Sequence, residues 1–209
     1  MVSKSGVDIV NILPDAYHSL MNRPYHHGNL KAALVAAARD QLRQAADREL
    51  SLRELARTVG VSPNAPYRHF PTKELLAAAL VTAGYRELTQ IAEEALTSGR
   101  PIVTLTQGYQ RFATQEPALL RLLEAENFLG RDPESDVVLA RDEWFSALVA
   151  IVEREGGSLA ADEAYRRAAT VWAVMQGGQQ LRNYGGRGLL PPELHPDIAE
   201  LAKRVARGR

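Results

Sequence analysis

Apolar residues recur every three or four positions along nearly all of the chain after Gly28, which is the spacing of a buried helix face. Alternating β-branched runs bounded by turn pairs, the pattern of strands, are not found. The pattern predicts an all-α protein of about nine helices. We expect a first helix capped near Asn29, helices over 52–59 and 63–70, a long fourth one from Thr72 to about Ser98, and further helices over 102–115, 117–129, 133–155, 160–184 and 195–207.

The segment Ser51–Lys73, SLRELARTVGVSPNAPYRHFPTK, carries the clearest local signals. Ser51 can cap a helix, with Glu54 reaching back to complete a capping box. Gly60 suits the left-handed end of that helix, and Ser62 with Pro63 suits the start of a second one. Two short helices joined by a three-residue turn form the helix-turn-helix layout, whose second helix enters the DNA major groove. The segment therefore predicts a DNA-reading head.

Pro66 falls at the fourth position of that second helix. A proline there removes a backbone hydrogen bond and disfavours helical geometry at Ala65. We therefore expect an irregular recognition helix, with Phe70 as a buried anchor behind it.

The charge distribution supports a head that meets DNA. The 209 residues hold 25 basic and 25 acidic side chains, so the overall charge is zero. From Asn22 to Lys73 there are nine Lys/Arg against four acids, whereas from Ile91 onward there are fourteen against seventeen. A basic head on a mildly acidic body fits a protein that neutralises phosphates with one end. The alternative is the ordinary fluctuation of charge along any chain.

Several other classes of protein are disfavoured by composition. The chain has no cysteine, which excludes a disulfide framework, a thiolate nucleophile and a Cys-ligated metal site. No apolar run reaches the ~18 residues that span a bilayer, and the first twenty residues lack a secretory signal, so a cytoplasmic location is expected. No metal or cofactor is expected either, since the adjacent His26 and His27 lack ligand spacing.

Residues 1–24 are expected to form a flexible N-terminal arm. Met21 directly precedes the point where the helical pattern begins, which suggests that translation starts there rather than at Met1. The arm is poorly suited to touch DNA because Lys4 is its only basic residue before Arg23.

The chain resembles the TetR family of transcriptional regulators. The resemblance is carried by YHHGNLKAALVAAA at 25–38 and by SLRELARTVGVSPNAPYRHFPTKELL at 51–76. It implies a DNA-binding domain over 25–74 and a helical effector-binding and dimerisation domain over 75–209, joined by the fourth helix. The stretches GYQRFATQEPALLRLL at 108–123 and WAVMQGGQQL at 172–181 further resemble one TetR subgroup, in which a His is common where Gln176 stands.

The resemblance also implies roles for individual residues of the head. Asn64 is the best candidate base reader, since its amide can pair with an adenine edge, and Arg53 is the candidate guanine reader. Tyr67, His69 and Lys73 are expected to donate to phosphates. The full expected DNA surface is Arg53, Ser62, Pro63, Asn64, Ala65, Tyr67, Arg68, His69 and Lys73. Two alternatives to these roles stay open: Arg53 is a solvent-exposed charge with no DNA contact, and Tyr67 packs in the core of the head.

In the body, the resemblance implies a homodimer and a small-molecule effector. The expected dimer contacts lie on one apolar stripe and are Ala164, Ala168, Val171, Met175 and Gly178. The alternative is that this stripe belongs to the core of the single chain. The effector is expected to be largely apolar, and the candidate contacts are Phe112, Arg121, Leu123, Asn127, Phe128, Trp144, Leu148, Trp172 and Gln176.

The expected function is thus a sequence-specific DNA-binding regulator, a ligand-released repressor that binds a palindromic operator as a homodimer. An activator with the same head is a variant of this interpretation. The alternative from another class is a small all-helical enzyme or binding module, for which a nucleophile with a base, a metal cluster or paired acids would be required. No such set is found in the sequence.

Overall fold

The computed structural model describes residues 30–44, 50–125, 135–185 and 197–208. Throughout these ranges the regular structure is helical, and no strand occurs in them. The elements are α2 (Leu30–Gln44), α3 (Leu52–Val59), the 3₁₀ helix η3 (Pro66–Arg68), α4 (Lys73–Thr97), α5 (Pro101–Gln115), α6 (Pro117–Glu124), α7 (Asp136–Gly156), α8 (Ala161–Gly185) and α9 (Ile198–Arg207). The predicted all-α fold with an N-terminal helix-turn-helix head is confirmed.

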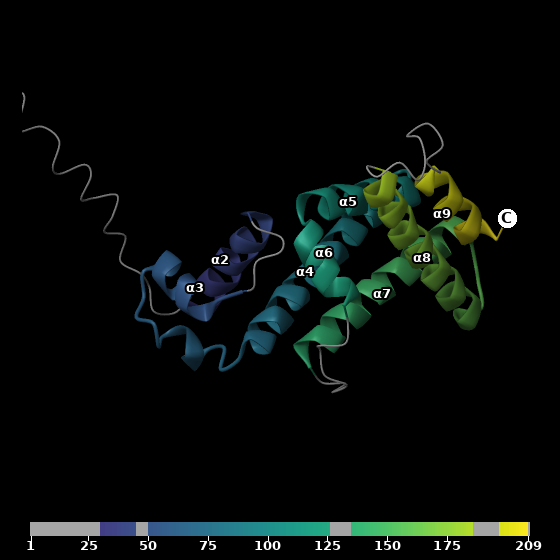
Figure 1. The fold of residues 1–209 in the computed structure, drawn as a ribbon. Coiled ribbons are helices and arrows are strands. Elements are labelled where there is room, and N and C mark those ends of the chain that lie inside the picture. The colour runs from purple at the N-terminus through teal and green to yellow at the C-terminus, as the bar shows by residue number, and fades with distance from the viewer. Residues whose placement is uncertain (1–29, 45–49, 126–134, 186–196, 209) are drawn as a thin grey trace, which may run out of the picture.

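Figure 1 shows the head, made of α2, α3 and η3, at one end of the molecule. The long helix α4 runs from the head into the body, where it packs against α5, α6 and α7. Helices α8 and α9 pack against each other at the end of the body far from the head. The connection between the two parts is therefore a continuous helix rather than a flexible linker.

The predicted caps of α3 are present in the structure. The hydroxyl of Ser51 accepts a hydrogen bond from the amide of Glu54 at 3.4 Å. At the other end, Gly60 has φ +76°, its amide donates to Arg57, and the amide of Val61 donates to Ala56. These paired bonds satisfy the last carbonyls of the helix and need the left-handed conformation that glycine adopts freely. The chain therefore turns sharply toward the recognition segment.

The recognition segment is irregular, as its proline predicts. The amide of Ala65 donates to the carbonyl of Ser62, that of Arg68 to Ala65 and that of His69 to Pro66. Each of these bonds joins residues three positions apart, the spacing of a 3₁₀ helix, whereas an α-helix joins residues four apart. Because Pro66 has no amide hydrogen, a regular α-helical ladder cannot continue through it. The 3₁₀ turn Pro66–Arg68 takes the place of the regular helix expected over 63–70. Phe70 is buried behind it, in agreement with its predicted role as an anchor.

The body is held by a core that continues into the head. Leu80 and Leu88 of α4 and Leu148 of α7 are fully buried, and each such burial contributes about 1.5–3 kcal/mol. Close helix approach depends on Gly108 of α5, where an added Cβ would lie 2.3 Å from a methyl group of Ile91. Within the described residues, no helix has the length and apolar character needed to cross a bilayer.

The remaining boundaries agree closely with expectation. The predicted break at Ser98–Pro101 separates α4 from α5, and α7, α8 and α9 each begin within three residues of the predicted start. Helix α6 is described to Glu124, and the rest of the predicted helix 117–129 lies outside the described residues, as do the arm 1–24 and Met21.

Candidate DNA-binding surface and effector cavity

The outer face of the head presents the residues predicted to meet DNA. Ala65 is half-buried, and the other eight are exposed, namely Arg53, Ser62, Pro63, Asn64, Tyr67, Arg68, His69 and Lys73. Beneath them, Pro66 and Phe70 are buried and attach the segment to the core. The base-reading and phosphate-binding roles stay predictions, and all but the half-buried Ala65 are accessible to solvent.

The start of α4 adds a helix N-terminus to this surface. Thr72 caps the helix, its hydroxyl accepting from the amide of Leu75 at 3.4 Å. Glu74 lies in the first turn, where a hydrogen bond from its own backbone amide, and then one from the Thr72 hydroxyl, lower the pKa of its carboxyl. A helix N-terminus favours anions such as phosphate, and Lys73 stands beside it. Arg57, exposed one turn after Arg53 on the same side of α3, is a basic residue that the sequence analysis left out of the surface.

In the body, a cavity of about 260 Å³ opens between α4, α6 and α8. It is lined by Tyr85, Leu123, Glu124, Trp172 and Gln176. Tyr85 and Leu123 are buried, whereas Trp172 and Gln176 are half-buried and Glu124 is exposed. The cavity therefore runs from the interior of the body to its surface. We refer to it as the α6 cavity.

The α6 cavity unites three of the predicted effector contacts, Leu123, Trp172 and Gln176. Phe112, Trp144 and Leu148 are instead buried in the core and do not line it, so their predicted direct contact with an effector there is not supported. Arg121 is exposed and also does not line the cavity, and Asn127 and Phe128 lie outside the described residues. Periodicity marks a residue as inward-facing, but only tertiary packing decides whether it meets a cavity or another side chain.

Two lining residues were missed by the sequence analysis. Tyr85 lies on the buried face of α4, where its pattern is that of an ordinary core aromatic. Glu124 ends α6, and desolvation in the cavity raises the pKa of its carboxyl, while the nearby charge of Arg121 opposes that effect. The only local signal for Glu124 is an acid at the end of an apolar helix.

An aromatic cluster forms the wall behind the α6 cavity. The ring of Trp172 meets Tyr109 and Trp144 edge-on, each at a centroid distance of 5.4 Å. Burial, and then the charge of Glu124, raise the pKa of the Tyr109 hydroxyl, which stays protonated. Within the described part of the chain, Tyr109 Oη and Trp144 Nε1 are buried without a hydrogen-bond partner. A buried unpaired donor costs about 1–3 kcal/mol, so this wall is less stable than a fully apolar core.

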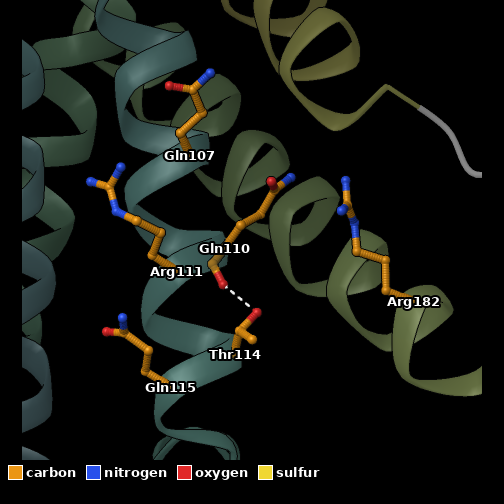
Figure 2. Close-up of a pocket in the computed structure, with 6 residues that line it drawn as sticks. All are labelled: Gln107, Gln110, Arg111, Thr114, Gln115 and Arg182. Atoms are coloured by element: carbon orange, nitrogen blue, oxygen red, sulfur yellow. Dashed lines mark hydrogen bonds between the residues drawn. The ribbon is translucent and has the colours of Figure 1, made fainter.

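A second hollow, of about 430 Å³, lies on the surface between α5 and α8. Its lining is Gln107, Gln110, Arg111, Thr114, Gln115 and Arg182. Figure 2 shows that these side chains point in several directions rather than toward one centre. Small-molecule sites are usually concave and bury most of their ligand, so the α6 cavity, which reaches the buried residues Tyr85 and Leu123, fits an effector better than this open surface groove does.

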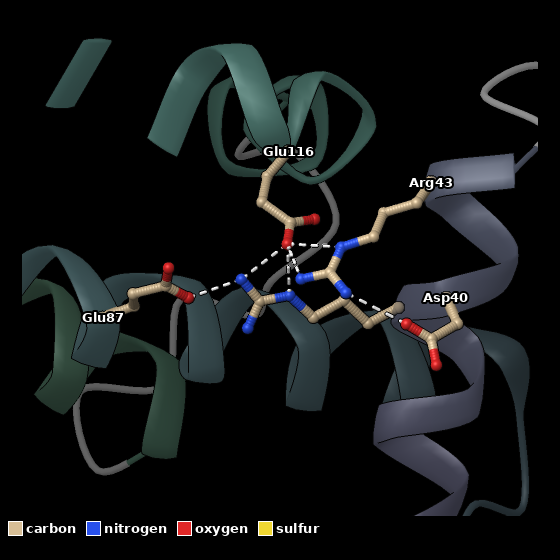
Figure 3. Close-up of polar contacts among 5 residues, drawn as sticks. Asp40, Arg43, Glu87 and Glu116 are labelled. Carbon is tan, nitrogen blue, oxygen red and sulfur yellow. Dashed lines mark hydrogen bonds and ion pairs between the residues drawn. The ribbon is translucent and has the colours of Figure 1, made fainter. Parts of the chain in front are cut away.

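An ion-pair cluster joins the head to the body. Arg39 and Arg43 of α2 both donate to Oε1 of Glu116, which lies between α5 and α6, and the Nε distances are 2.8 and 2.7 Å. Arg39 also pairs with Glu87 of α4. Figure 3 shows the carboxylate of Glu116 among these guanidinium groups. We call this cluster the head–body junction. Glu116 is only 2% exposed, so the body contributes a buried charge to it.

The apolar stripe of α8 was predicted to form the dimer interface, and that prediction is wrong. Ala164, Ala168 and Val171 are fully buried within the single chain and Met175 is 1% exposed, so they have no surface left for a partner. Gly178 permits close approach between helices, but to α9 of the same chain, since its added Cβ would lie 2.2 Å from the Ile198 side chain. The stripe is intramolecular core, the alternative that periodicity left open.

The outward side of α8 and α9 carries other apolar residues. Tyr165 is 60% exposed, Leu181 39% and Leu201 40%. Between the first two, Ala169 and Ala173 are exposed, and an added Cβ on Gly177 would meet nothing within 4 Å. We call these exposed residues of α8 and α9 together the α8–α9 face.

Comparison with known proteins places the chain among regulators. Residues 34–80 match the family described as bacterial regulatory proteins, tetR family. The nucleoid occlusion factor SlmA of Alteromonas mediterranea is 28% identical over 149 residues, which cover 65% of this chain and 75% of that protein.

Solved structures with the same fold extend the match beyond the head. A protein with unknown function from Rhodococcus sp. RHA1 is 31% identical, with a TM-score of 0.70 over 90% of this chain and 98% of that one. The TetR family transcriptional regulator PfmR from Thermus thermophilus is 17% identical, with a TM-score of 0.53 over 83% and 94% of the two chains, and it supports the fold alone.

Proposed function

The chain belongs to the TetR family of DNA-binding transcriptional regulators, and on that premise we propose that it is a ligand-released repressor that binds a palindromic operator as a homodimer. The observation that carries the DNA-binding half of this proposal is the outer face of the head. There Arg53 and Asn64 are exposed for base contacts, and Tyr67, His69 and Lys73 for phosphate contacts. The proposal includes no catalytic step.

Dimerisation follows from the size of the head. A single helix-turn-helix buries little surface on DNA, and such proteins bind as dimers to half-sites one helical turn, ~34–36 Å, or multiples of it apart. We assign the dimer contact to the α8–α9 face in place of the buried stripe. Exposed Tyr165, Leu181 and Leu201 would lose water on association, and the small residues Ala169, Ala173 and Gly177 would let two helices approach closely.

Release by a ligand is supported by the placement of α6. This helix begins beside Glu116 of the head–body junction and ends with Leu123 and Glu124 of the α6 cavity. A ligand that binds one position of α6 better than another would shift the junction with it, and so the orientation of the head.

Selection of bound sequences from random DNA by the purified protein tests the function. An inverted repeat with half-sites one turn apart, or a multiple of one turn, is the expected result. Recovery of no palindrome would refute the proposal. A reporter gene downstream of the selected sequence then separates repression from activation, since a repressor lowers its expression.

A further inference from the structure

The α6 cavity combines one carboxylate with aromatic side chains. Glu124 is the only charged residue among the five described residues that line it, and Tyr85 and Trp172 contribute aromatic rings. An aromatic face attracts a cation through the negative potential above the ring, and a carboxylate attracts it by charge. Among these five described residues, none is a basic side chain that would balance Glu124 from within the cavity.

We propose that the effector bound in the α6 cavity is a small organic cation, an amine or quaternary ammonium whose charge is held by Glu124 and whose apolar part packs against Trp172 and Leu123. This names the ligand class of the proposed effector site and rests on the proposed function. Gln176 supplies an amide that can hydrogen-bond to a polar group of the ligand.

The volume limits the size of the ligand. At about 260 Å³, the cavity lies just below the ~300–1,000 Å³ typical of small-molecule sites. It therefore suits a single substituted ring or a branched alkylamine rather than a large polycyclic compound. Tyr85 and Leu123 are buried, so the ring of the first and the methyl groups of the second can pack against the uncharged part of such a ligand at the inner end of the cavity.

The state of Glu124 agrees with a cationic ligand. Desolvation disfavours its ionised form, and a cation bound beside it would restore the missing attraction. Arg121, one helical turn earlier, acts on Glu124 from the exposed side of α6 without lining the cavity. Its charge reduces the net field of Glu124, so removing it should strengthen the binding of a cation.

The aromatic cluster supplies a direct probe of occupancy. The chain contains two tryptophans, Trp144 and Trp172, whose rings pack edge-on with their centroids 5.4 Å apart. One of them lines the cavity and the other lies behind it. Intrinsic fluorescence therefore reports on this site, and calorimetry gives the affinity.

Three compounds that share a benzyl group test the charge preference with the purified full-length protein. Benzyltrimethylammonium is the cation, benzyl alcohol the neutral compound and phenylacetate the anion. The cation is expected to bind about tenfold more tightly than benzyl alcohol and to change the tryptophan emission, and phenylacetate is expected to bind most weakly.

The variant Glu124→Gln tests whether the carboxylate of Glu124 holds the cation. It keeps the side-chain volume and removes the charge, so the affinity for benzyltrimethylammonium should fall about tenfold while that for benzyl alcohol changes less than about twofold. Glu93→Gln, which removes an exposed carboxylate of α4 outside the cavity lining, is the matched control and should leave both affinities unchanged. Arg121→Ala should raise the affinity for the cation.

The proposal is overturned if benzyltrimethylammonium does not bind at millimolar concentration, if the neutral or anionic compound binds as tightly, or if Glu124→Gln preserves the preference for the cation. These measurements need no DNA. If the protein selects a palindrome but shows no preference for the cation, the proposed ligand class is wrong and the proposed function stands. If it binds the cation but no operator, the ligand class stands and the proposed function as a regulator is wrong.

Discussion

The carboxylate of Glu116, between α5 and α6, accepts a hydrogen bond from Arg43 in the last turn of α2, and the two residues are 73 positions apart in the chain. Arg39, one turn earlier on α2, donates to the same oxygen. A single buried oxygen of the body therefore holds two arginines of the head, in addition to the covalent connection through α4.

Replacing Glu116 with glutamine should destabilise the protein by about 1–3 kcal/mol. Removing one partner of a fully buried ion pair costs about 3–5 kcal/mol, but Arg39 and Arg43 are 23% and 47% exposed, so solvent reduces the effect. Urea denaturation measures it. Asp40→Asn is the matched control, because Asp40 pairs with the same Arg43 at the surface and its loss should cost less than about 0.5 kcal/mol. Equal effects of the two variants would contradict a special role for the buried carboxylate.

Substitutions in the head should separate affinity from sequence preference. Tyr67→Phe and Lys73→Ala should weaken binding similarly on all DNA sequences and flatten its salt dependence, because both residues are predicted phosphate contacts. Arg53→Ala should relax the preference at one base pair by ~1–3 kcal/mol. Binding assays on operator variants at several salt concentrations distinguish the two results. An unchanged selected motif for Arg53→Ala would refute its role as a guanine reader.

A charge placed on the α8–α9 face should disrupt the proposed dimer. Ala173→Glu puts a carboxylate among exposed small residues, where association would bury it unpaired. Sedimentation should show a monomer that binds the full operator weakly and keeps its helical circular dichroism. Ser146→Glu, an exposed position on α7, should stay dimeric. A dimeric Ala173→Glu protein would place the interface elsewhere.

The adjacent glycines of α8 should respond to alanine in opposite directions. At Gly178 the new methyl group would lie 2.2 Å from Cδ1 and 2.5 Å from Cγ1 of Ile198, so the Ile198 side chain or α9 as a whole must shift, at a cost of about 1–3 kcal/mol. At Gly177 the methyl group meets nothing within the single chain, so in the monomer alanine should stabilise the helix by about 0.5–1 kcal/mol. Denaturation of both variants at a protein concentration low enough to keep the chain monomeric measures the difference. A similar effect of the two changes would contradict this packing.

Binding of a cation in the α6 cavity should depend on pH through Glu124. Desolvation raises the pKa of this carboxyl above its ordinary value of 4.5, and a bound cation favours its ionised form. Affinity should therefore be full at neutral pH and fall as the pH is lowered through that raised pKa, earlier than for an ordinary glutamate. Calorimetry with benzyltrimethylammonium across this range gives the profile. The Glu124→Gln profile should be flat, and a flat wild-type profile would contradict the role of the carboxylate.

Features of the fold that depend on near neighbours in sequence were predictable. The cap at Ser51, the left-handed Gly60 and the disturbance at Pro66 each follow from the chemistry of a few consecutive residues, and the structure contains all three. The exposure of the predicted DNA-binding residues follows in the same way, because the apolar stripe of α3 and the anchor Phe70 fix which side of the head is buried.

Features that depend on the packing of distant helices were not predictable. The spacing of Ala164, Ala168 and Val171 shows that one side of α8 is buried. Burial against a partner chain and burial against other helices of the same chain produce the same spacing, so the sequence alone does not distinguish them. Glu116 carries no local sign that it meets α2, and Tyr85 resembles any buried tyrosine until α6 and α8 are placed beside it. Each of these assignments needs the three-dimensional arrangement.

The 3₁₀ turn at Pro66 has a consequence for how the head can change over evolutionary time. Its backbone is held by amide-to-carbonyl bonds whose acceptors are Ser62, Ala65 and Pro66, and by the buried ring of Phe70. The side chains of Ser62, Asn64 and Tyr67 face solvent. The residues that keep the segment folded are thus largely different from those that would read the operator. New operator preferences are therefore accessible through single substitutions that leave the free energy of unfolding nearly unchanged.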